Sequence, residues 1–228
     1  MDDRYRIDRN HRPHRKPIGR FDIERDEMIE LLRQRGIRDE RLLSAMGSVA
    51  RNEFVQELFV NRSYEDSALP IGSSQTISQP YTVAFMTQCL EVKEGDKILE
   101  IGTGSGYHAA VLAAMGARVF TIERHMALLS EARTSFDKFG YDIASKCGDG
   151  TIGWTEFAPF DGILVTAGAP EVPQPLLDQL KDGGRLVIPI GDLSVQNLHV
   201  IRRVKDRYDT KITSGFKFVP LIGKKGWK

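Results

Sequence analysis

Short strand-forming segments alternate with helical segments from residue 96 onward, and this alternation limits what the chain can fold into more than any other feature. The predicted elements are strands at 97–101, 118–122, a short segment ending near Lys146, 161–166 and 185–189, with helices at 109–115, 125–139 and 173–180. Such alternation builds βαβ units, so we predict an α/β fold with a doubly wound, mostly parallel sheet. Two further strands, at 198–204 and 212–219, have no helix between them, and they predict an antiparallel pair at one edge of a seven-stranded sheet.

The part of the chain before the sheet divides into a basic tail and a helical lead-in. Residues 1–20 hold seven Lys or Arg and three acids, whereas the other 208 residues hold 25 basic and 28 acidic groups. Because the tail has little apolar surface to bury, we predict a flexible, solvated extension rather than a contact for nucleic acid or a membrane. Residues 21–228 are predicted to form one domain, with the lead-in at 21–66, a loop at 67–82 and the sheet region at 83–222.

Composition predicts a cytoplasmic protein with no membrane span, and we expect a monomer. No window approaches 18 consecutive apolar residues, and the start of the chain lacks the apolar core of a secretory signal. The two cysteines, Cys89 and Cys147, are too few for a disulfide framework and are expected to stay reduced. We predict no metal site.

The sharpest local motif is the run Glu-Ile-Gly-Thr-Gly-Ser-Gly-Tyr at 100–107, which falls where a strand becomes a helix. Glycines at such a turn let the backbone bend tightly and let a ligand approach the main chain. A nicotinamide dinucleotide site needs glycines at i, i+2 and i+5. The set starting at Gly102 fails at Tyr107, but Gly104, Gly106 and Ala109 form a permitted variant. The glycines alone therefore leave the cofactor open.

Three acidic residues near strand ends discriminate between the cofactors. Glu123 ends the second predicted strand, where a carboxylate can accept hydrogen bonds from ribose hydroxyls in either kind of site. Glu100 precedes the glycines, where a negative charge disfavours a pyrophosphate, and so a dehydrogenase, and favours the cationic S-adenosylmethionine. Asp149 can accept from an adenine amine, or it can merely cap the helix that starts near Thr151. Together these residues resemble the class I methyltransferase pattern.

An irregular segment upstream carries the signal for the substrate. Residues 68–81 read Ala-Leu-Pro-Ile-Gly-Ser-Ser-Gln-Thr-Ile-Ser-Gln-Pro-Tyr, which predicts a polar loop that is neither helical nor alternating. This run closely resembles the Pro-Ile-Gly-x-x-Gln-Thr-Ile-Ser-x-Pro segment of protein-L-isoaspartate O-methyltransferases. The resemblance covers about residues 24–222, through 98–107, 148–150, 158–161, 165–170, 177–191 and 218–221. The departures are the long basic start and Ser74, where many bacterial members have glycine.

The resemblance implies a repair enzyme that moves a methyl group from S-adenosyl-L-methionine to the free α-carboxylate of L-isoaspartyl residues in damaged proteins and peptides. It implies an active-site serine at Ser78 and substrate-binding positions at Thr76, Ile77 and Val219. The implied cofactor positions are Glu100, Gly102, Thr103, Gly104, Gly106, Glu123, Asp149 and Gly150.

The chemistry of this reaction predicts what Ser78 would do. A carboxylate is already ionised at neutral pH, so no general base is needed to make the nucleophile. Catalysis is then expected from in-line positioning and from the exclusion of water. Ser78 is accordingly expected to orient the carboxylate through a hydrogen bond and not to form a covalent intermediate.

Two other functions remain open at this point. The basic tail suggests a methyltransferase for nucleic acid bases, but those acting on amino groups usually carry an Asp/Asn-Pro-Pro-aromatic turn after the fourth strand. This chain has Thr-Ala-Gly-Ala-Pro at 166–170, so we expect no nucleic acid partner. A domain that binds the cofactor or a protein partner without turnover would be favoured by loss of Ser78, Glu100 or Asp149, and all three are present.

Overall fold

The computed structural model describes residues 19–228, so nearly all of the predicted basic tail lies outside the described residues. The helices are α1 (Arg20–Gln34), α2 (Glu40–Ser48), α3 (Pro80–Leu90), α4 (Tyr107–Ala114), α5 (Met126–Phe139) and α6 (Gln174–Asp178), with short 3₁₀ helices η1 (Arg51–Phe54), η2 (Glu57–Arg62), η3 (Gly150–Ile152) and η4 (Thr155–Phe157). Within the described range, none of the helices combines the length and the apolar character needed to cross a lipid bilayer.

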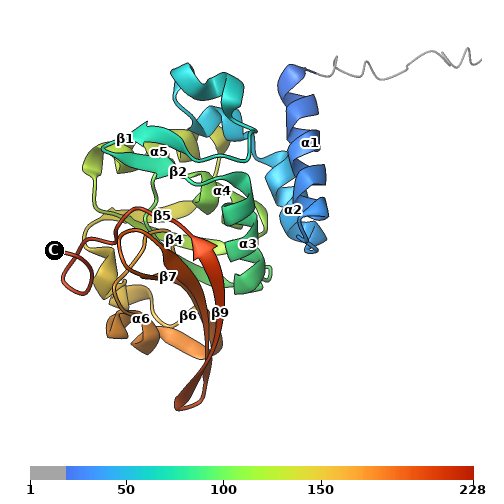
Figure 1. Cartoon of the computed structure of the whole chain (residues 1–228). Coiled ribbons are helices and arrows are strands. Elements are labelled where there is room, and N and C mark those ends of the chain that lie inside the picture. Colours follow the sequence, from blue (N-terminus) through green and yellow to red (C-terminus); the bar gives the residue numbers. More distant parts are fainter. Residues whose placement is uncertain (1–18) are drawn as a thin grey trace, which may run out of the picture.

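A seven-stranded sheet forms the centre of the described structure (Figure 1). Its strands are β3 (Lys97–Ile101), β4 (Arg118–Glu123), β5 (Ile143–Cys147), β6 (Phe160–Val165), β7 (Leu180–Gly191), β8 (Gln196–Val204) and β9 (Arg207–Phe216). They lie in the order β5-β4-β3-β6-β7-β8-β9, parallel from β5 to β7 and antiparallel from β7 to β9. The predicted fold class is therefore confirmed, including the antiparallel pair at one edge.

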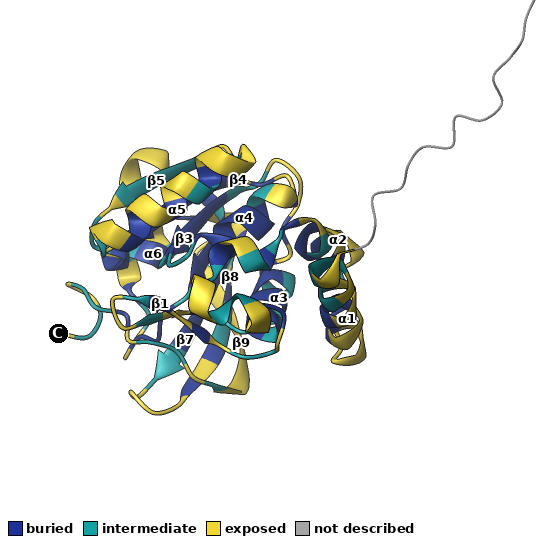
Figure 2. Cartoon of the chain, turned by 90° about the horizontal axis from the view of Figure 1, so that it is seen from above, coloured by how far each residue is buried: buried dark blue, intermediate teal, exposed yellow. Residues whose placement is uncertain are grey.

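Side chains alternate between the two faces of the sheet, and each face has its own helical cover. Ile98 packs in a core cluster with residues of helices α1 to α5, whereas its neighbour Leu99 packs in a second cluster with Leu176 of α6. Figure 2 shows the buried strands β3 and β4 between helices whose outer sides are exposed. Because successive strand residues point to opposite faces, two helical layers can bury one sheet.

Several predicted boundaries differ from the observed ones, most clearly near the C-terminal end of the sheet. The helix predicted at 173–180 is only the short α6, because Leu180 already pairs with Phe160 at the start of β7. The last strand, predicted at 212–219, is β9, which begins at Arg207 and ends at Phe216. Val219 lies beyond it in an extended segment, where its carbonyl accepts from the Gly168 amide at 2.8 Å. These boundaries depend on pairing with distant segments, which local patterns do not report.

The segment predicted as a loop with no regular structure is partly a β-hairpin, so that prediction was wrong. Strands β1 (Leu69–Gly72) and β2 (Gln75–Ile77) pair antiparallel, and Ser73 and Ser74 form the two-residue turn between them. Both serines have positive φ, 50° and 56°, as type I′ turns require. The sequence signal was hidden because glycine or asparagine usually occupies such positions.

Replacing Ser74 with glycine is expected to stabilise the protein by about 0.5–1 kcal/mol. The left-handed conformation costs an L-residue roughly 1–2 kcal/mol, and part of the gain is lost to the greater freedom of glycine in the unfolded chain. Thermal unfolding should therefore shift upward by about 1–4 °C. As a matched control, Ser130→Gly on the exposed side of α5 should lower stability, because the same change there removes helix propensity. A Ser74→Gly protein that melts at or below the wild-type temperature would contradict the argument.

Candidate active site

A pocket of about 260 Å³ opens at the carboxyl ends of the parallel strands. Its wall includes Ile101 at the end of β3, Glu123 at the end of β4 and Thr166 just after β6. The chain reverses its winding direction between β3 and β6, and open α/β sheets bind ligands at such a switch point. The hairpin β1–β2 and the C-terminal residues Leu221 and Ile222 complete the wall.

The glycine loop forms the floor of this pocket by a backbone conformation that side chains would prevent. Gly102 and Gly104 have φ of 96° and 53°, and the Gly102 amide donates to Ile122 O at 2.8 Å. A Cβ on Gly102 would collide with the Thr166 hydroxyl, which donates to the carbonyls of Ile101 and Gly102. A ligand can therefore lie directly on the main chain of this loop.

Glu123 is the acidic side chain in the pocket wall. It is almost fully buried, and its Oε2 accepts from the Gly104 amide at 3.0 Å while Oε1 accepts from the His125 amide at 2.9 Å. Because a carboxylate has about four lone-pair sites, acceptor capacity remains for a ligand diol. This geometry suits the ribose role predicted for Glu123.

Glu100 lies beneath the pocket and is not part of its wall. In the register of the sheet it pairs with Thr121, two residues before the strand end at which Glu123 stands. Its side chain is fully buried, Oε2 accepts from the Thr121 hydroxyl at 2.6 Å, and Oε1 has no partner among the described residues. Burial raises the pKa of Glu100 to about 8, so the carboxyl is largely neutral at pH 7. The carboxyl of Glu100 therefore lacks most of the negative charge that the sequence argument assumed.

A chain of hydroxyls nevertheless connects Glu100 to the pocket. The Thr121 hydroxyl that donates to Glu100 also lies 2.6 Å from the hydroxyl of Thr103, and Thr103 lines the pocket. This chain of hydroxyls is one route by which Glu100 can influence a ligand.

The carboxylate of Asp149 is likewise outside the pocket wall, although its neighbours Gly148 and Gly150 line it. Oδ1 accepts from the amide and the hydroxyl of Thr151, and Oδ2 accepts from the Lys224 amide at 2.8 Å. Although partial burial opposes it, these bonds from Lys224 and Thr151 hold the pKa of Asp149 below its ordinary value. The geometry matches the alternative in which Asp149 caps the helix η3, and it also ties the C-terminal segment to the site.

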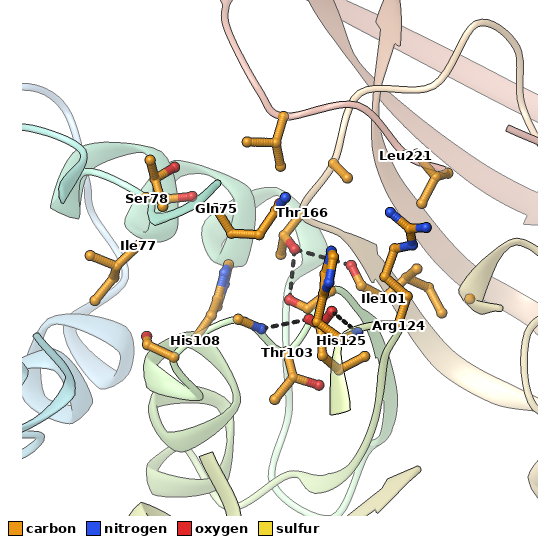
Figure 3. A pocket seen from close by; sticks show the side chains of 18 of the residues that line it. Gln75, Ile77, Ser78, Ile101, Thr103, His108, Arg124, His125, Thr166 and Leu221 are labelled. Carbon is orange, nitrogen blue, oxygen red and sulfur yellow. Dashed lines mark hydrogen bonds between the residues drawn. The ribbon is translucent and has the colours of Figure 1, made fainter. Parts of the chain in front are cut away.

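The hairpin side of the pocket carries the four residues that the resemblance assigns to the substrate. Thr76, Ile77, Ser78 and Val219 all line it, with Ser78 half-buried. Figure 3 shows Ser78 and Ile77 on one side and Arg124 and His125 on the other. A second cavity of about 50 Å³ shares Thr76, Ser78 and Val219 with the pocket and continues toward Lys217 and Phe218. The structure thus brings the predicted substrate residues together. Gly106, which the resemblance assigns to the cofactor, does not line the pocket and lies next to the Phe136 ring.

Other lining residues were missed by the sequence argument. His108 is the second residue of α4 and is buried, with Nε2 2.7 Å from the Thr87 hydroxyl, and burial lowers its pKa to about 3. The position of His108, two residues after Gly106, was the feature of the sequence that could have indicated its place in the pocket. Leu221 belongs to the run 218–221 that carries the resemblance, but no local pattern places Leu221 or Ile222 in the pocket, because bonds to distant residues such as Gly168 and Asp149 hold the C-terminal segment there.

Comparison with known proteins identifies the family. Residues 23–226 match the family protein-L-isoaspartate(D-aspartate) O-methyltransferase. The chain belongs to this family. The family predicted from the sequence is confirmed, and with it the prediction that the chain is a methyltransferase.

Curated relatives and solved structures agree with this assignment. Over 210 residues the chain is 53% identical to the protein-L-isoaspartate O-methyltransferase of Salinibacter ruber, covering 87% of this chain and 91% of that protein. The Chlorobium phaeobacteroides enzyme is 52% identical over 206 residues, 90% and 95% of the two chains. A solved protein-L-isoaspartate O-methyltransferase superposes with a TM-score of 0.81 at 28% identity, covering 89% and 67%. A putative Plasmodium falciparum member in complex with S-adenosyl-L-homocysteine gives 0.76 at 26% identity, covering 87% and 98%.

The pocket of this family member fits S-adenosyl-L-methionine. A Cβ on Gly102 would collide with Thr166 and a Cβ on Gly150 with Ile101, so glycine at these two positions leaves both lining residues in place. Glu123 offers acceptors for a ribose diol, and the glycine loop itself, at 101–108, contains no lysine or arginine, although Arg124 lines the pocket elsewhere. A cationic, phosphate-free nucleoside derivative matches this set of groups.

Proposed function

We propose that this chain methylates the free α-carboxylate of L-isoaspartyl residues in damaged proteins and peptides, with S-adenosyl-L-methionine as methyl donor. The observation that carries the proposal is that the Ser78 hairpin and the glycine loop line one pocket, in a chain whose family match spans residues 23–226. Methylation makes the carboxylate an ester, a better leaving group, so that the succinimide can re-form and hydrolyse partly to normal aspartate.

Five residues are proposed to hold the donor: Gly102, Thr103, Gly104, Glu123 and Gly150. When bound, S-adenosyl-L-methionine supplies an electrophilic methyl group on a sulfonium. Support comes from the open main chain of the loop and from the acceptor oxygens of Glu123. Glu100, Gly106 and Asp149 do not line the pocket and are proposed to act indirectly. Glu100 and Gly106 would hold the glycine loop in place, and Asp149 would hold the C-terminal segment.

Ser78 is proposed to orient the nucleophile. The substrate carboxylate is ionised at neutral pH and needs no base, so a hydroxyl donor suffices to fix its direction. His108 in the wall is neutral at this pH and is already bonded to Thr87, which makes it a poor proton acceptor for the reaction. The partly buried side chains of the hairpin and the Val219 segment reduce access of water to the reacting oxygen.

The smaller cavity beside Ser78 offers space for the substrate residues that flank the isoaspartyl residue. It shares Thr76, Ser78 and Val219 with the larger pocket, so a residue bound at Ser78 has neighbours that can extend toward Lys217. Folded and unfolded substrates with an exposed isoaspartyl link fit such an open arrangement. We further propose a monomer that works in the cytoplasm, which suits its two free cysteines.

The test is to offer S-adenosyl-L-methionine with a labelled methyl group to two peptides that differ only in one normal versus isoaspartyl linkage. The label should enter the isoaspartyl peptide alone and should be released by mild base, because a methyl ester hydrolyses whereas an N-methyl group does not. A duplex and a single-stranded oligonucleotide serve as the nucleic acid arm and should stay unlabelled. Equal labelling of both peptides, label in the oligonucleotides, or binding of the donor without any transfer would each reject the proposal.

A further inference from the structure

Arg51, the first residue of η1, is a fully buried cation beside the site. Its Nε donates to Ser63 O at 2.7 Å and its Nη2 donates to Ser78 O, also at 2.7 Å. The centre of the guanidinium lies 4.9 Å from the centroid of the Tyr107 ring, within cation–π distance. One rigid group therefore contacts three segments that are far apart in the sequence.

The burial of this charge calls for a physical reason. Burial lowers the pKa of Arg51 to about 10, which still leaves the guanidinium charged at neutral pH. Among residues 19–228 no carboxylate lies within ion-pair distance of it, and Nη1 has no hydrogen-bond partner. A buried charge without a counter-ion usually costs stability, and an apolar residue of similar size would avoid that cost. Arg51 is thus a poor choice for packing alone.

The three contacts connect the two halves of the pocket. Ser78 belongs to the hairpin side, whereas Tyr107, the first residue of α4, lines the pocket directly after the glycine loop. Phe54, at the other end of η1, packs edge-on against the same Tyr107 ring with centroids 5.8 Å apart. The short helix η1 therefore holds Ser78 at a fixed distance from the start of α4.

We infer that Arg51 is a positioning residue for methyl transfer, which holds the main chain of Ser78 so that its hydroxyl meets the substrate carboxylate in line with the bound donor. The inference rests on the proposed function. Arginine suits the task because its planar fork donates in two fixed directions at once, toward Ser63 and Ser78, whereas lysine offers a single mobile ammonium. Small displacements of a positioned group are costly for in-line chemistry.

The experiment compares Arg51→Lys and Arg51→Met with Arg41→Lys as the matched control. Arg41 also donates to backbone carbonyls, of Val92 and Met115, but neither of these two residues lines a cavity, whereas Ser78 lines both. For each protein, kcat and KM are measured with an isoaspartyl peptide, normalised to the folded fraction by circular dichroism, and donor affinity is measured by calorimetry without peptide. Arg51→Lys should lower kcat/KM for the peptide about 10-fold and Arg51→Met further, with donor affinity within about threefold of wild type. Arg41→Lys should match wild type in both.

A double-mutant cycle with Ser78→Ala separates positioning from general stability. If Arg51 acts through Ser78, adding Arg51→Lys to Ser78→Ala should cost little beyond Ser78→Ala alone. Multiplying effects, or losses that vanish after normalisation to the folded fraction, would overturn the inference. So would an Arg51→Lys protein as active as Arg41→Lys. A wild-type protein inactive on every isoaspartyl peptide would instead reject the proposed function.

Discussion

Ser78→Ala is expected to lower kcat for an isoaspartyl peptide by about 10- to 150-fold, because a hydrogen bond to a charged group contributes about 1.5–3 kcal/mol. The side chain lines the pocket and its removal leaves the main-chain bond from Arg51 to Ser78 O in place, so the fold should persist. Donor affinity should stay within about twofold of wild type, since the proposed donor residues lie on the glycine loop, β4 and η3 rather than on the hairpin. Steady-state kinetics and calorimetry measure the two quantities separately.

Two further variants sharpen this prediction. Ser78→Thr keeps a hydroxyl donor and should recover part of the lost turnover, whereas Ser130→Ala on the exposed side of α5 should behave as wild type. Mass spectrometry of the enzyme during turnover distinguishes orientation from covalent catalysis. Methylated Ser78 in that spectrum, or a Ser78→Ala enzyme with unchanged kcat, would contradict the orienting role.

Glu100→Gln is expected to make the unliganded protein progressively more stable than wild type as the pH rises. Burial raises the folded-state pKa of Glu100 from its ordinary 4.5 to about 8. Below pH 4.5 the carboxyl is protonated in both states and has no pH-dependent effect. Between 4.5 and 8 the unfolded chain releases the proton and the folded protein retains it, so wild-type stability falls with rising pH, and above about 8 the loss is constant. The neutral amide of glutamine does not titrate and removes this loss.

The size of the effect makes it measurable by urea unfolding at several pH values. From pH 5 to pH 8 the free energy of unfolding of Glu100→Gln minus that of wild type should grow by on the order of 4 kcal/mol, at 1.36 kcal/mol per pH unit. Asp161→Asn is the control. Although partial burial opposes it, bonds from Lys181 and Lys97 hold the pKa of Asp161 below its ordinary value. The contribution of the Asp161 carboxylate to stability is lost only in acid. The difference in free energy of unfolding between Asp161→Asn and wild type should therefore stay constant from pH 5 to pH 8. A flat Glu100→Gln difference would show that the buried carboxyl is ionised.

Local patterns in the sequence were sufficient for the fold class and for the glycine loop. The strands of the sheet were predicted because β-branched runs alternate with helical periodicity, which is a local signal. The ligand-binding turn at Gly102 and Gly104 was predicted because glycine allows a tight turn between a strand and a helix. The structure has positive φ at both residues, a conformation that favours glycine. The hairpin β1–β2 was not predicted because its turn consists of Ser73 and Ser74. Serine is not a residue type that indicates a left-handed turn, whereas glycine and asparagine are.

The candidate site was predicted less completely, and the acids show why. Glu100, Glu123 and Asp149 all stand near strand ends in the sequence, but only Glu123 reaches the pocket wall. In the register of β3 against β4, Glu100 pairs with Thr121, two residues before Glu123 at the end of β4. The carboxylate of Asp149 instead accepts a hydrogen bond from the Lys224 amide of the C-terminal segment. Register and docking of distant segments are tertiary properties that no single segment encodes.

The α/β class, the position of the ligand loop and, through the run at 68–81, the family all follow from the amino-acid sequence. These depend on periodicity, turn chemistry and residue order, which are properties of neighbours in the chain. The tertiary structure alone decided which acid faces the pocket, that Asp149 is bonded to the C-terminal segment, and that Arg51 joins Ser78 to Tyr107. Direction and burial of a side chain follow from packing against residues far away in sequence, so these facts appear only once the chain is folded.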